Sequence, residues 1–125
     1  MTSPKERRRS PRVENNVPLK ISGEDFDIVT ESKNLSVSGA YCTVDQYLEP
    51  MTKLKIQLLL PFRKKNALTT RKISCQGVVV RTQAHAQDKN FSIAIYFNEV
   101  EAKAHKLIAE YVAGLLKESP GIESP

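Results

Sequence analysis

Four arginines fall within six residues near the start of the chain: Arg7, Arg8, Arg9 and Arg12. Ser10-Pro11 interrupts them, and a proline disfavours helical geometry in the residue before it. The segment is therefore predicted to be an extended or turning arm with projecting guanidinium groups. A guanidinium donates two parallel hydrogen bonds to a phosphate or to guanine O6 and N7, and it stacks on aromatic rings. These residues predict an anionic or purine-bearing partner, and a solvated basic tail is the alternative.

A second polar segment, Asn34-Leu35-Ser36-Val37-Ser38-Gly39, lies about one hairpin further along the chain. Asparagine, serine and glycine are the common turn residues, so an ordinary turn between two strands is one interpretation. The other is that Asn34, Ser36 and Gly39 complete a binding site with the arginines.

The positive charge is concentrated at one end of the sequence. The net charge is +5, and residues 1–12 carry five cationic side chains against Glu6, so the remaining 113 residues carry only +1. A domain that coats nucleic acid usually spreads its charge over one face. The clustering favours a compact anionic ligand.

Apolar and polar residues alternate in several segments that are typical of strands. Six are predicted, at residues 17–21, 26–33, 40–45, 54–60, 72–83 and 91–98. The fifth contains Val78-Val79-Val80, which is either buried on both sides or bulged at Gly77. Residues 61–70 are predicted to be a loop with Arg63-Lys64-Lys65 at its tip, a charged tip or a partner-docking segment.

The apolar period then changes from two to 3.6, which predicts a helix over 99–117. Asn98 is the expected N-cap with Glu101 in the capping-box position, and Gly114 and Lys117 mark the end. No helix separates the strands, so the chain is predicted to be mainly β, an antiparallel small barrel or sandwich. The helix covers an open end or packs outside. Residues 1–16 are predicted to be a flexible arm, 17–117 the folded domain and 118–125 a disordered tail.

Arg8-x-x-x-Arg12 and Asn34-x-Ser36-x-x-Gly39, taken together and in this order, resemble the PilZ family. The resemblance covers about residues 6–113 and implies a six-stranded antiparallel β-barrel with a C-terminal helix. It also implies a receptor for cyclic di-GMP, a bacterial second messenger, with no other cofactor. The last strand has Ala94 where many relatives have glycine, and alanine is small enough for similar packing.

The resemblance assigns a role to each motif residue. Arg8 and Arg12 would clamp the phosphates and guanines from the arm. Asn34 would accept from guanine through its amide oxygen, without the charge of the aspartate that many relatives carry. Ser36 would donate its hydroxyl to a phosphate or base. Gly39 would supply a positive φ, or room for close approach of ligand to backbone.

Arg7 and Arg9 flank the arginine pair, and Arg7 stands where relatives that capture a stacked ligand dimer have an arginine. Four guanidinium groups exceed what the two charges of one ligand require. The arm therefore predicts two ligand molecules per chain. Simple solvated charge at Arg7 or Arg9 is the alternative.

Nothing in the sequence indicates an enzyme. Cys42 and Cys75 form no CxxC pair and are expected to be buried thiols in a reducing cytosol. His85 and His105 are expected to be solvated, and no signal peptide or membrane-spanning stretch is visible. A cytoplasmic protein, monomeric or weakly dimeric, is therefore expected.

Three functions remain in competition. The first is a cyclic di-GMP receptor that orders its arm on binding and signals to a protein effector. The second is a PilZ-like adaptor that does not bind nucleotide. The third is an RNA-binding small barrel, which would need aromatic platforms and a positive groove. The chain has only eight aromatic residues, so specific binding of nucleic acid is not expected.

Overall fold

The computed structural model describes residues 16–64 and 67–118, and the arm with its four arginines lies outside this range. Within the range the chain forms six strands and one helix, and the predicted mainly-β class is confirmed. The elements are β1 (Val17–Ser22), β2 (Asp27–Ser36), β3 (Gly39–Val44), β4 (Lys53–Lys64), β5 (Ala67–Ala84), β6 (Phe91–Glu99) and α1 (Ala102–Glu118).

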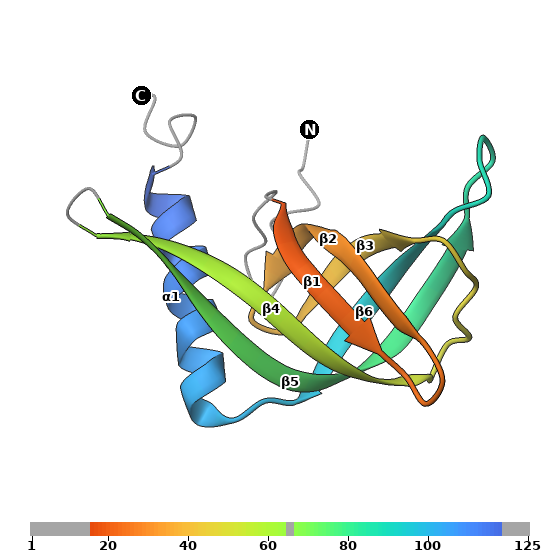
Figure 1. Cartoon of the computed structure of the whole chain (residues 1–125), viewed down its shortest axis with the longest axis horizontal. Coiled ribbons are helices and arrows are strands. Elements are labelled where there is room, and N and C mark those ends of the chain that lie inside the picture. The colour runs from red at the N-terminus through yellow and green to blue at the C-terminus, as the bar shows by residue number, and fades with distance from the viewer. Residues whose placement is uncertain (1–15, 65–66, 119–125) are drawn as a thin grey trace, which may run out of the picture.

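The six strands form one closed antiparallel barrel in the order β1-β2-β3-β6-β5-β4 (Figure 1). Pairing of β1 with β4 closes the ring, with Leu19 opposite Leu58. Pairing of β3 with β6 joins its two halves, with Cys42 opposite Ile93. A barrel is therefore observed rather than a sandwich.

Alternate side chains of every strand fill the barrel, as a two-residue period requires. The largest fully buried ones include Leu19, Ile21, Leu35, Ile56, Leu58, Leu60 and Ile93. Helix α1 contributes Ile108, Tyr111 and Val112 to the same core. The ring of Tyr111 meets that of Phe62 edge to face, with centroids 6.0 Å apart. Burial of this helix face fixes α1 against the β4–β5 hairpin.

The predicted loop at 61–70 is wrong, because β4 runs to Lys64 and β5 begins at Ala67. Pro61 lies within the β4–β5 ladder, opposite Thr70. Just before β4 begins, the Val79 N–H donates to the Thr52 carbonyl oxygen and the Met51 N–H donates to the Val79 carbonyl oxygen. From this point to the tip of the β4–β5 hairpin the register does not shift. Odd-numbered β5 residues therefore bond to β4 and even-numbered ones do not. Pro61 lies opposite Thr70, which is even-numbered and does not bond to β4. The missing N–H of Pro61 therefore removes no hydrogen bond from the ladder.

The predicted N-cap is also wrong, because Asn98 belongs to β6 and α1 begins at Ala102. The His105 N–H donates to the Glu101 carbonyl oxygen at 2.9 Å, which makes Glu101 the N-cap residue. Gly114 does not end the helix, which continues to Glu118. In β5 the alternative of a bulge at Gly77 is confirmed by a register shift there, and Val80 is 52% exposed.

Both cysteines are buried free thiols, as predicted. Burial raises the pKa of Cys42 to about 12 and that of Cys75 to about 11. The prediction for His85 is wrong: its ring is half-buried and contacts Asp88 Oδ1 at 3.0 Å and Ser92 Oγ at 2.7 Å. No helix in the described part of the chain has the length and hydropathy needed to cross a bilayer.

Candidate ligand-binding site

The predicted binding segment is a tight hairpin rather than a long turn. β2 continues through Asn34 and ends at Ser36, β3 begins at Gly39, and only Val37 and Ser38 form the turn. The buried Leu35 explains the continuation, since it faces the core and leaves Asn34 partly exposed on the outer face.

Ser36 organises this hairpin from within. Its side chain is fully buried, and its Oγ accepts from the Ser38 N–H at 3.2 Å and lies 3.1 Å from Ser38 Oγ. The Ser38 carbonyl in turn accepts from the Phe97 N–H at 2.9 Å, which ties the turn to β6. Ser36 is therefore a turn-building residue in the described structure.

Gly39 does not have a positive φ, so that part of the prediction is wrong. The close approach is instead between two strands. A Cβ atom at Gly39 would lie well inside van der Waals contact of the main-chain carbonyl oxygen of Ile95 on β6. Glycine at this position allows β3 to lie close against β6.

Strand pairing places the motif residues in two rows across the outer face of β2, β3, β6 and β5. The first row is Asn34, Tyr41, Ala94 and Arg81. The second row is Ser36, Gly39, Tyr96 and Val78. Neighbours within a row are about 5 Å apart, so the two rows form one small surface.

Large and small residues alternate diagonally on this surface. Tyr41 and Tyr96 occupy one diagonal, and Gly39 and Ala94 occupy the other. Tyr96 is 50% exposed, and Arg81 is exposed at the end of the first row. Two aromatic rings next to open space can stack on flat bases, and a guanidinium can pair with a phosphate.

The structure brings Asn34, Ser36 and Gly39 together as the sequence predicted, while Arg7, Arg8, Arg9 and Arg12 lie outside the described residues. The sequence analysis missed Tyr41, Tyr96 and Arg81. The two tyrosines alternate with buried residues, namely Ala40, Cys42, Ile95 and Phe97. The two-residue period of the strands could therefore have placed them on the outer face. Arg81 could not be found this way, because the bulge between Val79 and Arg81 shifts the parity.

Comparison with known proteins agrees with the fold. A search of the curated proteins found no match to the sequence. Among solved structures, the Bacillus subtilis inhibitor of motility MotI is similar, with a TM-score of 0.79 and 20% identity. The match covers 91% of this chain and 53% of MotI, so the chain spans about half of that protein.

Two isolated domains are also similar. The PilZ domain of Escherichia coli YcgR, solved with cyclic di-GMP, has a TM-score of 0.59 and 12% identity, covering 90% of this chain and 93% of that one. The PilZ domain of CeSA from a cellulose-synthesizing bacterium has a TM-score of 0.57 and 15% identity, covering 86% and 99%. The PilZ domain model matches residues 6–114, which include the four arginines and the β2–β3 hairpin. The chain therefore belongs to the PilZ domain family.

Proposed function

We propose that the chain is a receptor for cyclic di-GMP that passes the signal to a protein partner. The observation that carries the proposal is the two-row surface, where Asn34, Gly39 and two tyrosines meet on one outer face. The family match extends over the arginine arm as well, so both halves of the expected site belong to one domain.

In this proposal each group acts through its ordinary chemistry. Arg8 and Arg12 donate to the phosphates and to guanine, while Asn34 accepts from a guanine N–H. Tyr41 and Tyr96 offer faces on which a base can stack, and Arg81 adds a cation at the far end of the row. Ser36 contributes chiefly by fixing the hairpin, since its hydroxyl already bonds within the turn.

The proposed role is reception rather than catalysis, with cyclic di-GMP as the ligand and no other cofactor. Binding would order the arm against the outer face of β2 and β3, and a partner would read the changed surface. The ligand is an intracellular messenger, so the receptor would work in the cytoplasm.

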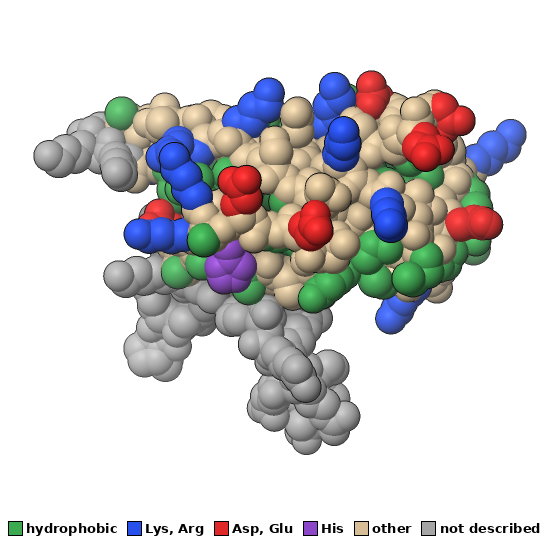
Figure 2. Space-filling view, turned by 90° about the horizontal axis from the view of Figure 1, so that it is seen from below, with side chains coloured by type: hydrophobic (Ala, Val, Ile, Leu, Met, Phe, Trp, Pro, Cys, Tyr) green, Lys and Arg blue, Asp and Glu red, His purple; other side chains and the backbone are tan. Residues whose placement is uncertain are grey.

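One face of the molecule carries a charge pattern that does not favour the RNA-binding alternative. On the face shown in Figure 2, Lys and Arg side chains are interspersed with Asp and Glu rather than gathered in a stripe. A sequence-independent RNA binder requires a continuous positive groove. The adaptor alternative predicts the same fold without nucleotide binding, so only a binding experiment separates it from the receptor.

Isothermal titration of the full chain with cyclic di-GMP tests the proposal, with cyclic di-AMP as the ligand control. We expect cyclic di-GMP to bind and cyclic di-AMP to bind much more weakly, because adenine lacks the O6 acceptor and the N1–H and N2–H donors of guanine. Asn34→Ala should weaken binding, while Asn90→Ala, in the distant β5–β6 connection, should not. Absence of heat at tens of micromolar ligand would leave the adaptor as the function.

A further inference from the structure

One strand edge remains open although the barrel is closed. β5 pairs with β4 along its whole first half, but its pairing with β6 begins only at Gln76. Residues 67–75 therefore have no strand on the side away from β4, within the described chain. Figure 1 shows this part of the β4–β5 hairpin running out beyond the ring and across α1.

The main-chain groups of this edge point outward at alternate residues. Because odd-numbered β5 residues bond to β4, the N–H and C=O groups of Thr70, Lys72 and Ser74 face the open side. No hydrogen bond to these groups from another described residue is present outside the β4–β5 ladder. They form a template on which an extended chain can add as a strand.

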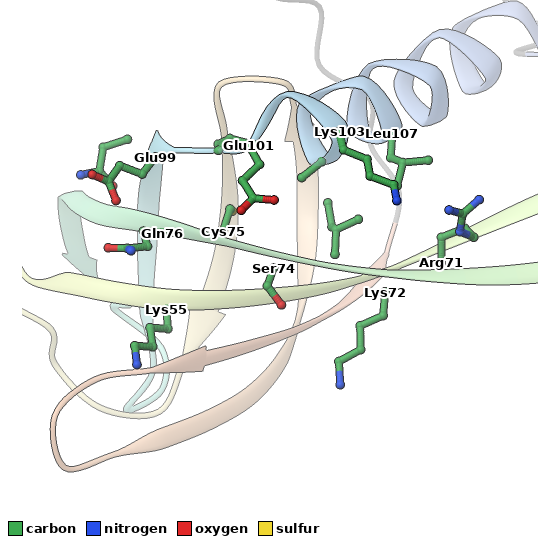
Figure 3. Close-up of a pocket in the computed structure, with 14 residues that line it drawn as sticks. Lys55, Arg71, Lys72, Ser74, Cys75, Gln76, Glu99, Glu101, Lys103 and Leu107 are labelled. Atoms are coloured by element: carbon green, nitrogen blue, oxygen red, sulfur yellow. The ribbon is translucent and has the colours of Figure 1, made fainter.

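A groove of about 910 Å³ runs along this edge, between β5 and the first turns of α1 (Figure 3). Ile73 and Cys75 on the strand and Ala104 and Leu107 on the helix provide its apolar part. None of its lining residues belongs to the β2–β3 hairpin, so the groove is separate from the proposed nucleotide site.

The charges of the groove indicate what would occupy it. Arg71 and Lys103 approach it from strand and helix, while Lys72 follows Arg71 on β5 and points away from α1 (Figure 3). None of the three has an ion pair within the described structure, where the only pair is His85–Asp88. Glu99 and Glu101 lie at the opposite end, near β6 (Figure 3). An acidic segment is therefore attracted to the half of the groove that has the free strand edge.

We propose that this edge binds an extended, acidic segment of a partner protein, which adds as a strand to β5 with alternate apolar side chains against α1. This names a docking surface for the partner of the proposed receptor, but it does not depend on nucleotide binding. A second copy of the chain fits less well, because pairing β5 with β5 would bring the Arg71 and Lys72 side chains of both copies together.

The edge of β4 on the other side of the same hairpin is protected against strand addition, unlike the edge of β5. Pro61 has no N–H to offer on the open side of β4, and prolines commonly block exposed edges in this way. β5 has neither proline nor bulge between Ala67 and Gln76.

The test uses the full chain and a fluorescein-labelled peptide of alternating glutamate and valine, followed by fluorescence anisotropy. Ser74→Pro removes an outward N–H without changing charge or the ladder to β4, and should weaken binding at least tenfold. Ser74→Ala, which keeps that N–H, should bind like the wild type. Lys103→Glu should weaken binding, and Lys89→Glu, the same charge change in the β5–β6 connection, should not.

Two N-methylated peptides test strand addition without changing the protein. One carries methyl groups on the glutamate amides and the other on the valine amides, and only one of these sets can face β5. One peptide should therefore lose binding while the other retains it. Equal behaviour of the two peptides would overturn the proposal, as would a wild-type dimer that Ser74→Pro converts to monomer. Cyclic di-GMP binding, titrated separately, should be the same in Ser74→Pro and wild type.

Discussion

Gly39 on β3 lies directly against the main-chain carbonyl of Ile95 on β6, with no room between them for a Cβ atom. The two strands pair through this contact, with Gly39 opposite Tyr96 and Ala40 opposite Ile95. Because the oxygen belongs to the backbone, it cannot move away as a flexible side chain could.

We expect Gly39→Ala to lower the free energy of unfolding by about 1–3 kcal/mol, because the strands must separate to admit the methyl group. Gly114→Ala is the matched control. Nothing lies within 4 Å of its Cβ position in α1, so this change should stabilise the protein by up to about 1 kcal/mol. Urea unfolding of the two variants measures both effects, and equal midpoints would show that the Ile95 contact imposes no constraint.

Arg8→Ala and Arg12→Ala should each weaken cyclic di-GMP binding by about 1.5–3 kcal/mol, the usual loss for a hydrogen bond to a charged group. Their melting temperatures should match the wild type, since the described core draws only on residues from Val17 onward. Titration calorimetry and thermal melting check the two halves of this prediction. Binding within twofold of wild type in both variants would exclude the arm from the site.

Arg7 is expected to determine how many ligand molecules bind. The wild type should titrate near two molecules of cyclic di-GMP per chain, because four arginines can pair with the charges of a stacked dimer. Arg7→Leu should still bind but should titrate near one. A wild-type value of one that Arg7→Leu leaves unchanged would identify Arg7 as ordinary surface charge.

The buried thiols predict a loss of stability at alkaline pH. Folding raises the pKa from 9.0 to about 12 at Cys42 and to about 11 at Cys75, so the unfolded state releases these protons first. Their contribution is fully present below about pH 9 and is lost as pH rises through the folded values. Urea midpoints should therefore fall more steeply above pH 9 in the wild type than in Cys42→Ala/Cys75→Ala. Parallel pH profiles would contradict this.

Periodicity predicted the six strands and the helix because each buries alternate or helically spaced apolar residues, as Leu54, Ile56, Leu58 and Leu60 do on β4. The boundaries failed where tertiary pairing overrides local signals. Pro61 predicts a break in isolation, but opposite Thr70 it removes no bond. Asn98 is a good cap residue, but pairing of Glu99 with Gln76 keeps the chain in β6 past it.

Asn34, Ser36 and Gly39 lie together on one hairpin, but the reason for glycine at position 39 depends on a strand more than fifty residues later. Local turn chemistry suggested a positive φ, whereas the structure requires glycine because of Ile95. Arg81 joins the two-row surface only because a bulge turns it outward. Such relationships exist only once the strands are paired.

Closure of the ring also constrains how the protein can fold. β3 lies between β2 and β6, and β1 pairs with β4 although β2 and β3 separate the two strands in the sequence. Four of the six strand pairings join consecutive strands, and the other two, β1 with β4 and β3 with β6, join segments distant in sequence. The ring closes only when these two long-range pairings form, so we expect them to be the slow part of folding. During synthesis, the β2–β3 hairpin must wait for Phe91–Glu99 to leave the ribosome before its second neighbour exists. A ribosome stalled before that strand would carry a nascent chain whose two-row surface still lacks Ala94 and Tyr96.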